Sequence, residues 1–224
     1  MGGSASARAR WARCGWVCSL AIGMVAPAMA APGIDFNGQA ASSEARQMAQ
    51  WAFESRDTQG KPFAVVDKKQ AKVFVFGGNG HLLGAAPALL GLAPGDAAVP
   101  GIGRRAVRDI APNERTTPAG RFESEPGHNH LGEAIVWVDY DASLAIHRLR
   151  PAAAAERRPE RLASDTPDDN RISMGCIVVS PRFFDEVVGP SLGRQRGVVY
   201  VLPETDAGRL MAANAAGGAR PTLR

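Results

Sequence analysis

The sequence predicts a mostly β domain, of β-sandwich or barrel-like type, with a few short helices and long loops. Short runs of β-branched and aromatic residues recur between residues 61 and 204, and turn-forming residues separate them. Two stretches, 91–115 and 150–171, are rich in charged residues, Pro or Gly and interrupt this pattern. They predict two long loops, which in a compact domain are typical of binding elements.

The first thirty residues predict a secretory signal peptide, residues 1–30. Arg8, Arg10 and Arg13 form a basic leader, and an uncharged apolar run over 15–25 follows it. Ala28-Met29-Ala30 then has the small-x-small pattern of a cleavage site. The run is too short, and too closely followed by the cleavage site, to be a membrane-spanning helix. We therefore expect an exported protein.

Without this leader the chain is nearly neutral and keeps one cysteine, Cys176. The formal net charge falls from +4 to +1, which provides no electrostatic basis for binding nucleic acid. No second apolar stretch approaches the length of a membrane helix, so no stable membrane insertion is expected after signal removal. A single thiol excludes a thioredoxin-like pair. We expect neither a metal nor a cofactor.

The predicted elements follow the chain in order. Residues 31–60 predict a linker and a short N-terminal helix, for which Ser42 or Ser43 is a suitable N-cap. The predicted strands and apolar runs are 63–66, 72–76, a strand ending near 92, 121–124, 135–140, 143–147, 176–179 and 198–202. Pro181 favours the start of a helix. Residues 205–224, rich in Ala and Gly, predict a disordered tail.

Cys176 is the candidate nucleophile. An unpaired cysteine in an exported protein is open to oxidation, so its presence suggests that it has a function. Gly175 precedes it, and glycine lets the backbone approach a substrate carbonyl closely. Backbone N–H groups at such a turn suit the stabilisation of an oxyanion. The apolar residues after Cys176 fit the alternative interpretation, a buried structural cysteine.

A thiol near its ordinary pKa needs a base, and histidine is the usual one. His147 ends an apolar predicted strand, so its ring is expected where that strand meets a loop. His81 follows a turn, and His128 and His130 lie two positions apart in a predicted loop. Two histidines without a third ligand nearby do not indicate a metal site.

Three segments together resemble the catalytic domain of the L,D-transpeptidases, the YkuD-type family of cell-wall enzymes. Thr117-Pro118-Ala119-Gly120-Arg121-Phe122 is similar to the family's TPxGxF segment. His147 at a strand end and Ser173-x-Gly175-Cys176-Ile177 complete the pattern in the same order. The similarity covers about residues 62–203, so residues 61–204 are predicted to be an L,D-transpeptidase-like catalytic domain.

The resemblance also implies the roles of the site residues. Cys176 would be the nucleophile and His147 its proton donor and acceptor. Gly175 and Ser173 would support the oxyanion. Family members orient the histidine with a backbone carbonyl rather than with a carboxylate, so no third catalytic side chain is expected.

The sequence departs from the family pattern at three places. Met174 replaces a second histidine that many members carry, and Val178 stands where the family usually has Arg or Asn. His147 and Cys176 lie 29 positions apart, more than in most members, so 150–171 resembles an insertion beside the site.

The resemblance implies an exported enzyme of the periplasm or cell envelope that acts on peptidoglycan stem peptides. It would form a thioester on Cys176 and transfer the acyl group to an amine, which is L,D-transpeptidation and cross-links the cell wall. Two alternatives stay open. An L,D-carboxypeptidase or amidase would use water as the acceptor, and a catalytically silent protein would bind the wall with the same fold.

Overall fold

The computed structural model describes residues 1–2 and 33–205. Apart from positions 1, 2 and 205, the predicted signal peptide 1–30 and the predicted disordered tail 205–224 lie outside these residues. The strands are β1 (Phe63–Asp67), β2 (Lys72–Phe76), β3 (Leu82–Pro87), β4 (Leu90–Gly91), β5 (Gly120–His128), β6 (Ala134–Asp139), β7 (Leu144–Arg148), β8 (Arg171–Ser173), β9 (Ile177–Val179) and β10 (Gly197–Val201).

The helices are short and lie between these strands or before them. The α-helices are α1 (Ser43–Glu54), α2 (Arg158–Ala163) and α3 (Pro181–Phe183), the last continuing into the π-helix η6 (Phe184–Val188). The 3₁₀ helices are η1 (Ile102–Arg104), η2 (Val107–Asp109), η3 (Pro112–Glu114), η4 (Ala154–Glu156) and η5 (Asp168–Asn170). The prediction of a mostly β domain with a few short helices is confirmed.

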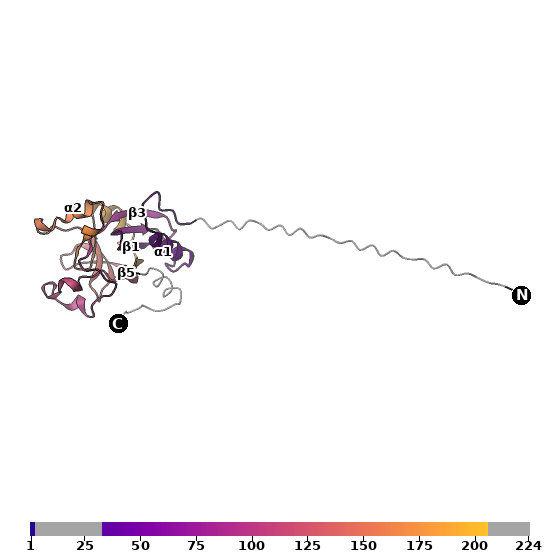
Figure 1. The fold of residues 1–224 in the computed structure, drawn as a ribbon, viewed down its shortest axis with the longest axis horizontal. Coiled ribbons are helices and arrows are strands. Elements are labelled where there is room, and N and C mark those ends of the chain that lie inside the picture. The colour runs from indigo at the N-terminus through magenta and orange to yellow at the C-terminus, as the bar shows by residue number, and fades with distance from the viewer. Residues whose placement is uncertain (3–32, 206–224) are drawn as a thin grey trace. The chain divides into compact units, whose positions relative to one another are not determined.

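One eight-stranded sheet, in the order β3-β2-β1-β10-β5-β6-β7-β9, forms most of the domain, and β4 pairs with β8 beside it. Figure 1 shows the strands wrapped around a common interior. The long strand β5 joins the two halves of the sheet. Its residues 120–124 pair with β10 and its residues 125–128 pair with β6. The sheet therefore curls into a nearly closed, barrel-like form.

The main core lies inside this curled sheet. It collects alternate residues of both halves, such as Val66 and Val199 from one half and Ile146 and Ile177 from the other. Along β1, Phe63 and Val65 point to the face opposite Val66, because successive side chains of a strand alternate. Strand β1 is consequently buried on both faces, which explains the apolar run 63–66 that precedes Asp67.

Helix α1 covers the outer face of β1, β2 and β10. As predicted, Ser42 caps it, and its Oγ accepts a hydrogen bond from the Ala45 N–H at 3.0 Å. The segment before the helix differs from the predicted linker, because Phe36 is only 2% exposed. Its ring packs edge-on against Phe74 and Phe76. Ile34 packs against the same cluster, and its N–H donates to Gln50 Oε1 of α1 at 2.7 Å, so the segment is anchored to the folded domain.

Both predicted long loops are present, and each contains short helices. The first carries η1, η2 and η3, and the second carries η4, α2 and η5. The second has a topological reason that the sequence did not reveal. β7 and β9 pair in parallel, and parallel neighbours need a long crossover connection. The parallel pairs β1–β10 and β4–β8, and strand β8 itself, were likewise not predicted.

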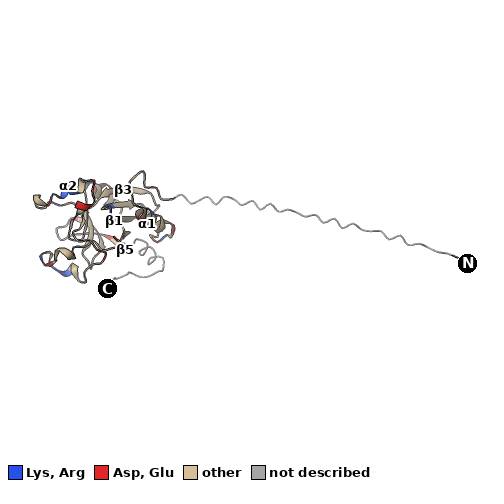
Figure 2. Ribbon diagram, viewed as in Figure 1, with Lys and Arg blue, Asp and Glu red and all other residues tan. Residues whose placement is uncertain are grey.

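Acidic and basic residues are intermingled along the ribbon in the view of Figure 2, in keeping with the nearly balanced charge. Within residues 1–2 and 33–205, no helix combines the length and the apolar character needed to cross a bilayer.

We predict that Phe36→Ala lowers the free energy of unfolding by about 3 kcal/mol, because it removes a buried ring from a packed aromatic group. Urea denaturation followed by circular dichroism measures the change. Leu83→Ala is the control, since Leu83 is 47% exposed and its truncation should stay within about 0.5 kcal/mol. Equal effects of the two substitutions would show that the segment before α1 does not belong to the folded unit.

Candidate active site

The pairing of β7 with β9 brings the two predicted catalytic residues to one face of the sheet. Ile146 pairs with Ile177 and His147 with Val178. Cys176 directly precedes β9 and therefore lies beside Ala145. Because side chains alternate along a strand, Cys176 and His147 point to the face opposite the buried pair Ile146 and Ile177. Strand spacing and rise place their Cα atoms roughly 8 Å apart on a diagonal.

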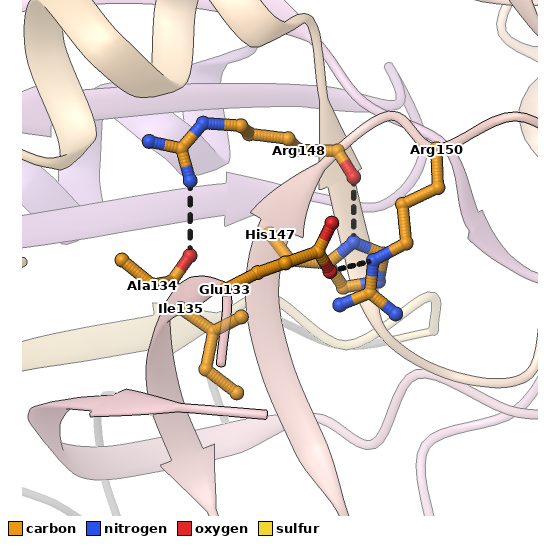
Figure 3. A pocket seen from close by; sticks show the side chains of 6 residues that line it. All are labelled: Glu133, Ala134, Ile135, His147, Arg148 and Arg150. Carbon is orange, nitrogen blue, oxygen red and sulfur yellow. Dashed lines mark hydrogen bonds and ion pairs between the residues drawn. The ribbon is translucent and has the colours of Figure 1, made fainter. Parts of the chain in front are cut away.

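The His147 ring is oriented by a backbone carbonyl. Its Nδ1 lies 2.7 Å from the Arg148 carbonyl oxygen (Figure 3). A carbonyl only accepts hydrogen bonds, so Nδ1 carries the proton and the lone pair lies on Nε2. Burial lowers the pKa of His147, an effect that the bond to Arg148 opposes and the nearby cation of Arg150 reinforces. The ring is therefore neutral at pH 7 and has the form of a base.

Charged and apolar residues surround this ring in a small pocket. It is lined by Glu133, Ala134, Ile135, His147, Arg148 and Arg150. Glu133 and Arg150 form an ion pair at 2.8 Å beside the imidazole, as Figure 3 shows. Neither carboxylate oxygen of Glu133 bonds to the ring, so the arrangement holds a histidine and a backbone carbonyl without an acidic third member.

The Cys176 thiol is held in its protonated form. Its Sγ donates a hydrogen bond to the Ser143 carbonyl oxygen at 3.3 Å. Burial raises the pKa of Cys176, while the Ala145 backbone N–H and the charge of Arg150 oppose this shift. Among the hydrogen bonds of the described residues, none joins Sγ to the His147 ring. Formation of the thiolate therefore requires a proton acceptor, and the neutral Nε2 lies on the same face.

Gly175 and Ser173 form the tight turn that presents Cys176. Gly175 has φ +132°, and a Cβ there would lie 2.7 Å from the Thr116 carbonyl oxygen, so only glycine fits. Ser173 Oγ donates to the Cys176 carbonyl oxygen at 2.6 Å and accepts from the Gly175 N–H at 3.1 Å. Because the Gly175 N–H is used within the turn, the Cys176 N–H is the better candidate donor for an oxyanion.

Thr117 braces this turn, a role that the sequence analysis did not assign. It is fully buried, and its Oγ1 donates to the Gly175 carbonyl oxygen at 2.7 Å. The same oxygen accepts from the Gly91 N–H at 2.8 Å. The signal was present, because Thr117 begins the segment that resembles TPxGxF. Its spacing from Cys176 along the chain, however, does not reveal a contact.

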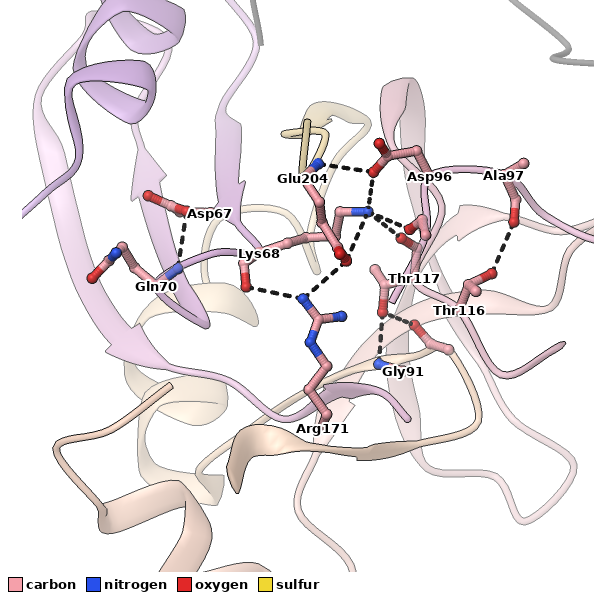
Figure 4. Close-up of polar contacts among 12 residues, drawn as sticks. Asp67, Lys68, Gln70, Gly91, Asp96, Ala97, Thr116, Thr117, Arg171 and Glu204 are labelled. Atoms are coloured by element: carbon pink, nitrogen blue, oxygen red, sulfur yellow. Dashed lines mark hydrogen bonds and ion pairs between the residues drawn. The ribbon is translucent and has the colours of Figure 1, made fainter. Parts of the chain in front are cut away.

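A buried ammonium group holds the Thr117 segment in turn. Lys68 Nζ donates to the Thr117 and Gly95 carbonyl oxygens at 2.9 and 2.7 Å and to Asp96 Oδ1 at 2.6 Å (Figure 4). Its side chain has no exposed surface. Desolvation lowers the pKa of Lys68, and the charge of Asp96 opposes the shift. A lysine in an apparent hairpin turn gave no sequence signal for this role.

Two more charged residues join the polar contacts around Lys68: Arg171 of β8 and Glu204, which follows β10. Arg171 Nη2 lies 2.9 Å from Glu204 Oε1 and donates to the Lys68 carbonyl oxygen at 3.3 Å (Figure 4). Glu204 Oε1 is also 3.6 Å from Lys68 Nζ. Segments that lie far apart in the sequence thus meet on one side of the turn that carries the thiol.

The departures from the family pattern have a structural setting. Val178 is 1% exposed and packs with Leu89, which lies between β3 and β4, and with Leu162 of α2. An apolar residue fits there because the crossover between β7 and β9 covers the outer face of β9. Met174 is half-buried in the turn before Gly175.

The other histidines do not join the site. His128 ends β5, where it pairs with Ala134, and His81 precedes β3. Within the described part of the chain, no group of three or more His, Cys, Asp or Glu residues is arranged to hold a metal ion.

The comparisons with known proteins do not show a family for this chain. No family model matches the sequence, and no curated protein matches it. The helical cell shape determining protein Pgp2 from Campylobacter jejuni is similar in structure with a TM-score of 0.42 and 15% identity, over 65% of this chain and 49% of that one. The LD transpeptidase LdtMt1 in complex with imipenem has a TM-score of 0.36 and 18% identity, over 63% and 58%.

The aligned part thus spans about half of one of these structures and somewhat more of the other. At this level of similarity the family assignment remains a prediction from the sequence. The geometry of Cys176 and His147 is the basis for the function proposed below.

We predict that Thr117→Val lowers the free energy of unfolding by about 2 kcal/mol, because the Gly91 N–H and the Gly175 carbonyl lose their partner while buried. Thr117→Ser is the matched control, since it keeps the hydroxyl and should retain most of the stability. Chemical denaturation measures both variants. A valine variant as stable as the wild type would contradict the role of the two hydrogen bonds, because valine keeps the methyl group and loses only the hydroxyl.

We predict that the alkylation rate of Cys176 by iodoacetamide rises about tenfold per pH unit up to a midpoint above the ~8.5 of a free cysteine. The sign follows from burial, which disfavours the charged thiolate and so raises the pKa. Stopped-flow or mass-spectrometric labelling measures the profile, and the urea-unfolded chain provides the reference midpoint. A midpoint at or below pH 7 would contradict the protonated resting thiol and indicate a preformed thiolate–imidazolium pair.

Proposed function

We propose that this protein is an exported cysteine acyltransferase that acts on peptidoglycan stem peptides. The observation that carries the proposal is the β7–β9 pairing, which puts a neutral imidazole and a protonated thiol on one face of the sheet. This combination suits nucleophilic acyl transfer with general base catalysis. The substrate class and the location in the periplasm or cell envelope rest on the L,D-transpeptidase resemblance and the signal-peptide pattern.

In the first half-reaction, Cys176 Sγ attacks the carbonyl carbon of an L-residue in the stem tetrapeptide, and the thiol proton moves to His147 Nε2. The carbonyl oxygen becomes an oxyanion, which the Cys176 N–H faces in this scheme. When the oxyanion collapses, the C–N bond to the terminal D-alanine breaks. His147 returns the proton to the departing amine, and a thioester remains on Cys176.

In the second half-reaction, the amine of a neighbouring stem peptide attacks the thioester carbonyl. His147 Nε2 takes the amine proton and passes it to the Cys176 sulfur as the C–S bond breaks. The product is a cross-linked peptide, and the thiol and the neutral imidazole are restored. Water in place of the amine gives an L,D-carboxypeptidase by the same steps, so the acceptor decides between the two activities.

A specific observation favours a second candidate, a wall-binding protein without turnover. Sγ bonds to the Ser143 carbonyl rather than to the imidazole, and burial raises the thiol pKa. Turnover requires the sulfur to exchange this bond for one to the proton acceptor. A protein in which the exchange does not occur would bind stem peptides and leave them intact.

We predict that the wild-type protein converts tetrapeptide muropeptides, with release of D-alanine, and that Cys176→Ala forms no product. Mass spectrometry of the reaction, with and without an added amine, identifies both the activity and the acceptor. A covalent adduct heavier by the acyl group should appear on the wild-type chain alone.

His147→Gln is the second variant, because it keeps a side chain of similar length and loses the base. It should lower the rate by about 10²- to 10⁴-fold while the protein stays folded. Equal product from wild type and Cys176→Ala would contradict the proposed chemistry. Binding of muropeptides without any product would favour the silent wall-binding protein.

A further inference from the structure

A second cavity, larger than the His147 pocket, opens beside the candidate nucleophile. It has a volume of about 510 Å³ and is lined by Gly101, Gly103, Arg104, Trp137, Tyr140, Asp141 and Ser143. Its walls come from η1 and from the β6–β7 hairpin, which touch where Ser143 Oγ donates to the Gly103 carbonyl oxygen at 3.2 Å. The volume falls in the range of small-ligand sites.

The strand register connects this cavity to the thiol. Trp137 pairs with Ala145 on β7, and Cys176 lies beside Ala145 on the other side. The three residues thus form a row across the sheet with their side chains on the same face. Two strand spacings put Trp137 and Cys176 roughly 10 Å apart. Ser143, whose carbonyl oxygen accepts the Cys176 thiol, also lines the cavity.

An aromatic pair forms one wall of the cavity. The rings of Trp137 and Tyr140 meet edge-to-face with centroids 4.9 Å apart. Tyr140 is nevertheless 72% exposed, although a large aromatic side chain usually gains by burial. The Trp137 ring lies close over Gly127, where a Cβ would be 2.5 Å from it. The pair therefore offers an open aromatic surface to a ligand.

The charges of the cavity favour a neutral polar ligand. Arg104 and Asp141 line it with opposite charges, so it presents no net charge to select the carboxylates of a peptide. Both side chains are exposed, and no ion pair or hydrogen bond of the Arg104 guanidinium occurs among the described residues. One donor and one acceptor beside an aromatic surface suit a pyranose, which combines an apolar C–H face with hydroxyl and acetamido groups.

We propose that this cavity binds an N-acetylated amino sugar of the glycan strand whose stem peptide reaches Cys176. The inference rests on the proposed function and adds a saccharide subsite to it. Three extended residues separate the sugar from the carbonyl that Cys176 attacks, and they span about 10 Å. This length is comparable with the roughly 10 Å that two strand spacings put between the backbones of Cys176 and Trp137. The sugar stacks on Tyr140, and Arg104 and Asp141 bind its polar groups.

The test compares kcat/KM for a disaccharide-tetrapeptide and for the same tetrapeptide without sugar. In the wild type we expect the disaccharide form to be preferred by about fivefold or more, the scale of a single aromatic contact. Tyr140→Leu should bring this ratio close to one, and Tyr140→Phe, which keeps the ring, should retain it. Leu131→Ala, an exposed substitution outside the cavity, is the surface control. A ratio that Tyr140→Leu leaves unchanged would overturn the proposal.

A binding measurement separates this inference from the proposed function. Titration of Cys176→Ala with tri-N-acetylchitotriose, followed by calorimetry, should show binding that Tyr140→Leu weakens about fivefold and Tyr140→Phe preserves. If no substrate is turned over but this pattern appears, the acyltransferase proposal fails and the saccharide subsite stands. If tetrapeptides are turned over but the saccharide neither binds nor raises kcat/KM, the subsite is wrong and the acyltransferase stands.

Discussion

The Lys68 ammonium group is the constraint on which the rest of the site depends. A charged amine without solvent exposure is costly unless each of its protons has an acceptor. Two backbone carbonyls and Asp96 provide these acceptors, and they belong to the long loop that ends in Thr117. The loop has little secondary structure of its own. Lys68 ties the loop's two ends, at Gly95 and Asp96 and at Thr117, to one point, and Thr117 in turn holds the turn that carries Cys176.

The protonation states at that turn follow from burial, which shifts the pKa values of two groups in opposite directions. Burial disfavours the anionic thiolate and the cationic imidazolium alike, so the pKa of Cys176 rises and that of His147 falls. The resting pair is uncharged on both sides. In the proposed mechanism, the sulfur therefore becomes nucleophilic only as its proton moves to His147 and a bound carbonyl is attacked. A protonated, half-buried thiol is less open to non-specific oxidation than an exposed thiolate.

Local patterns in the sequence were sufficient for most of the strands, though not for β8, and they suggested the two proposed catalytic residues. Runs such as 72–76 alternate or are continuously apolar in a way that predicts β-structure, and the motif around Cys176 suggested its partner His147. Non-local pairings were not predictable, because their partners are distant. Lys68 follows Asp67 in what resembles a solvated turn, whereas its partner Asp96 lies 28 positions away. Phe36 lies among small polar residues, and its burial depends on strand β2.

The central position of β10 has a consequence for how the chain reaches this structure. β10 lies between β1 and β5 in the sheet. Phe63 of β1 pairs with Val198, which comes 135 positions later in the sequence. Both halves of the sheet therefore lack a neighbour until the last strand is synthesised. Such high contact order implies slow, late folding of the chain as a whole. Cys176 is translated before β10, so the nascent protein passes through a stage in which the Cys176 sulfur is not yet buried by the closed sheet.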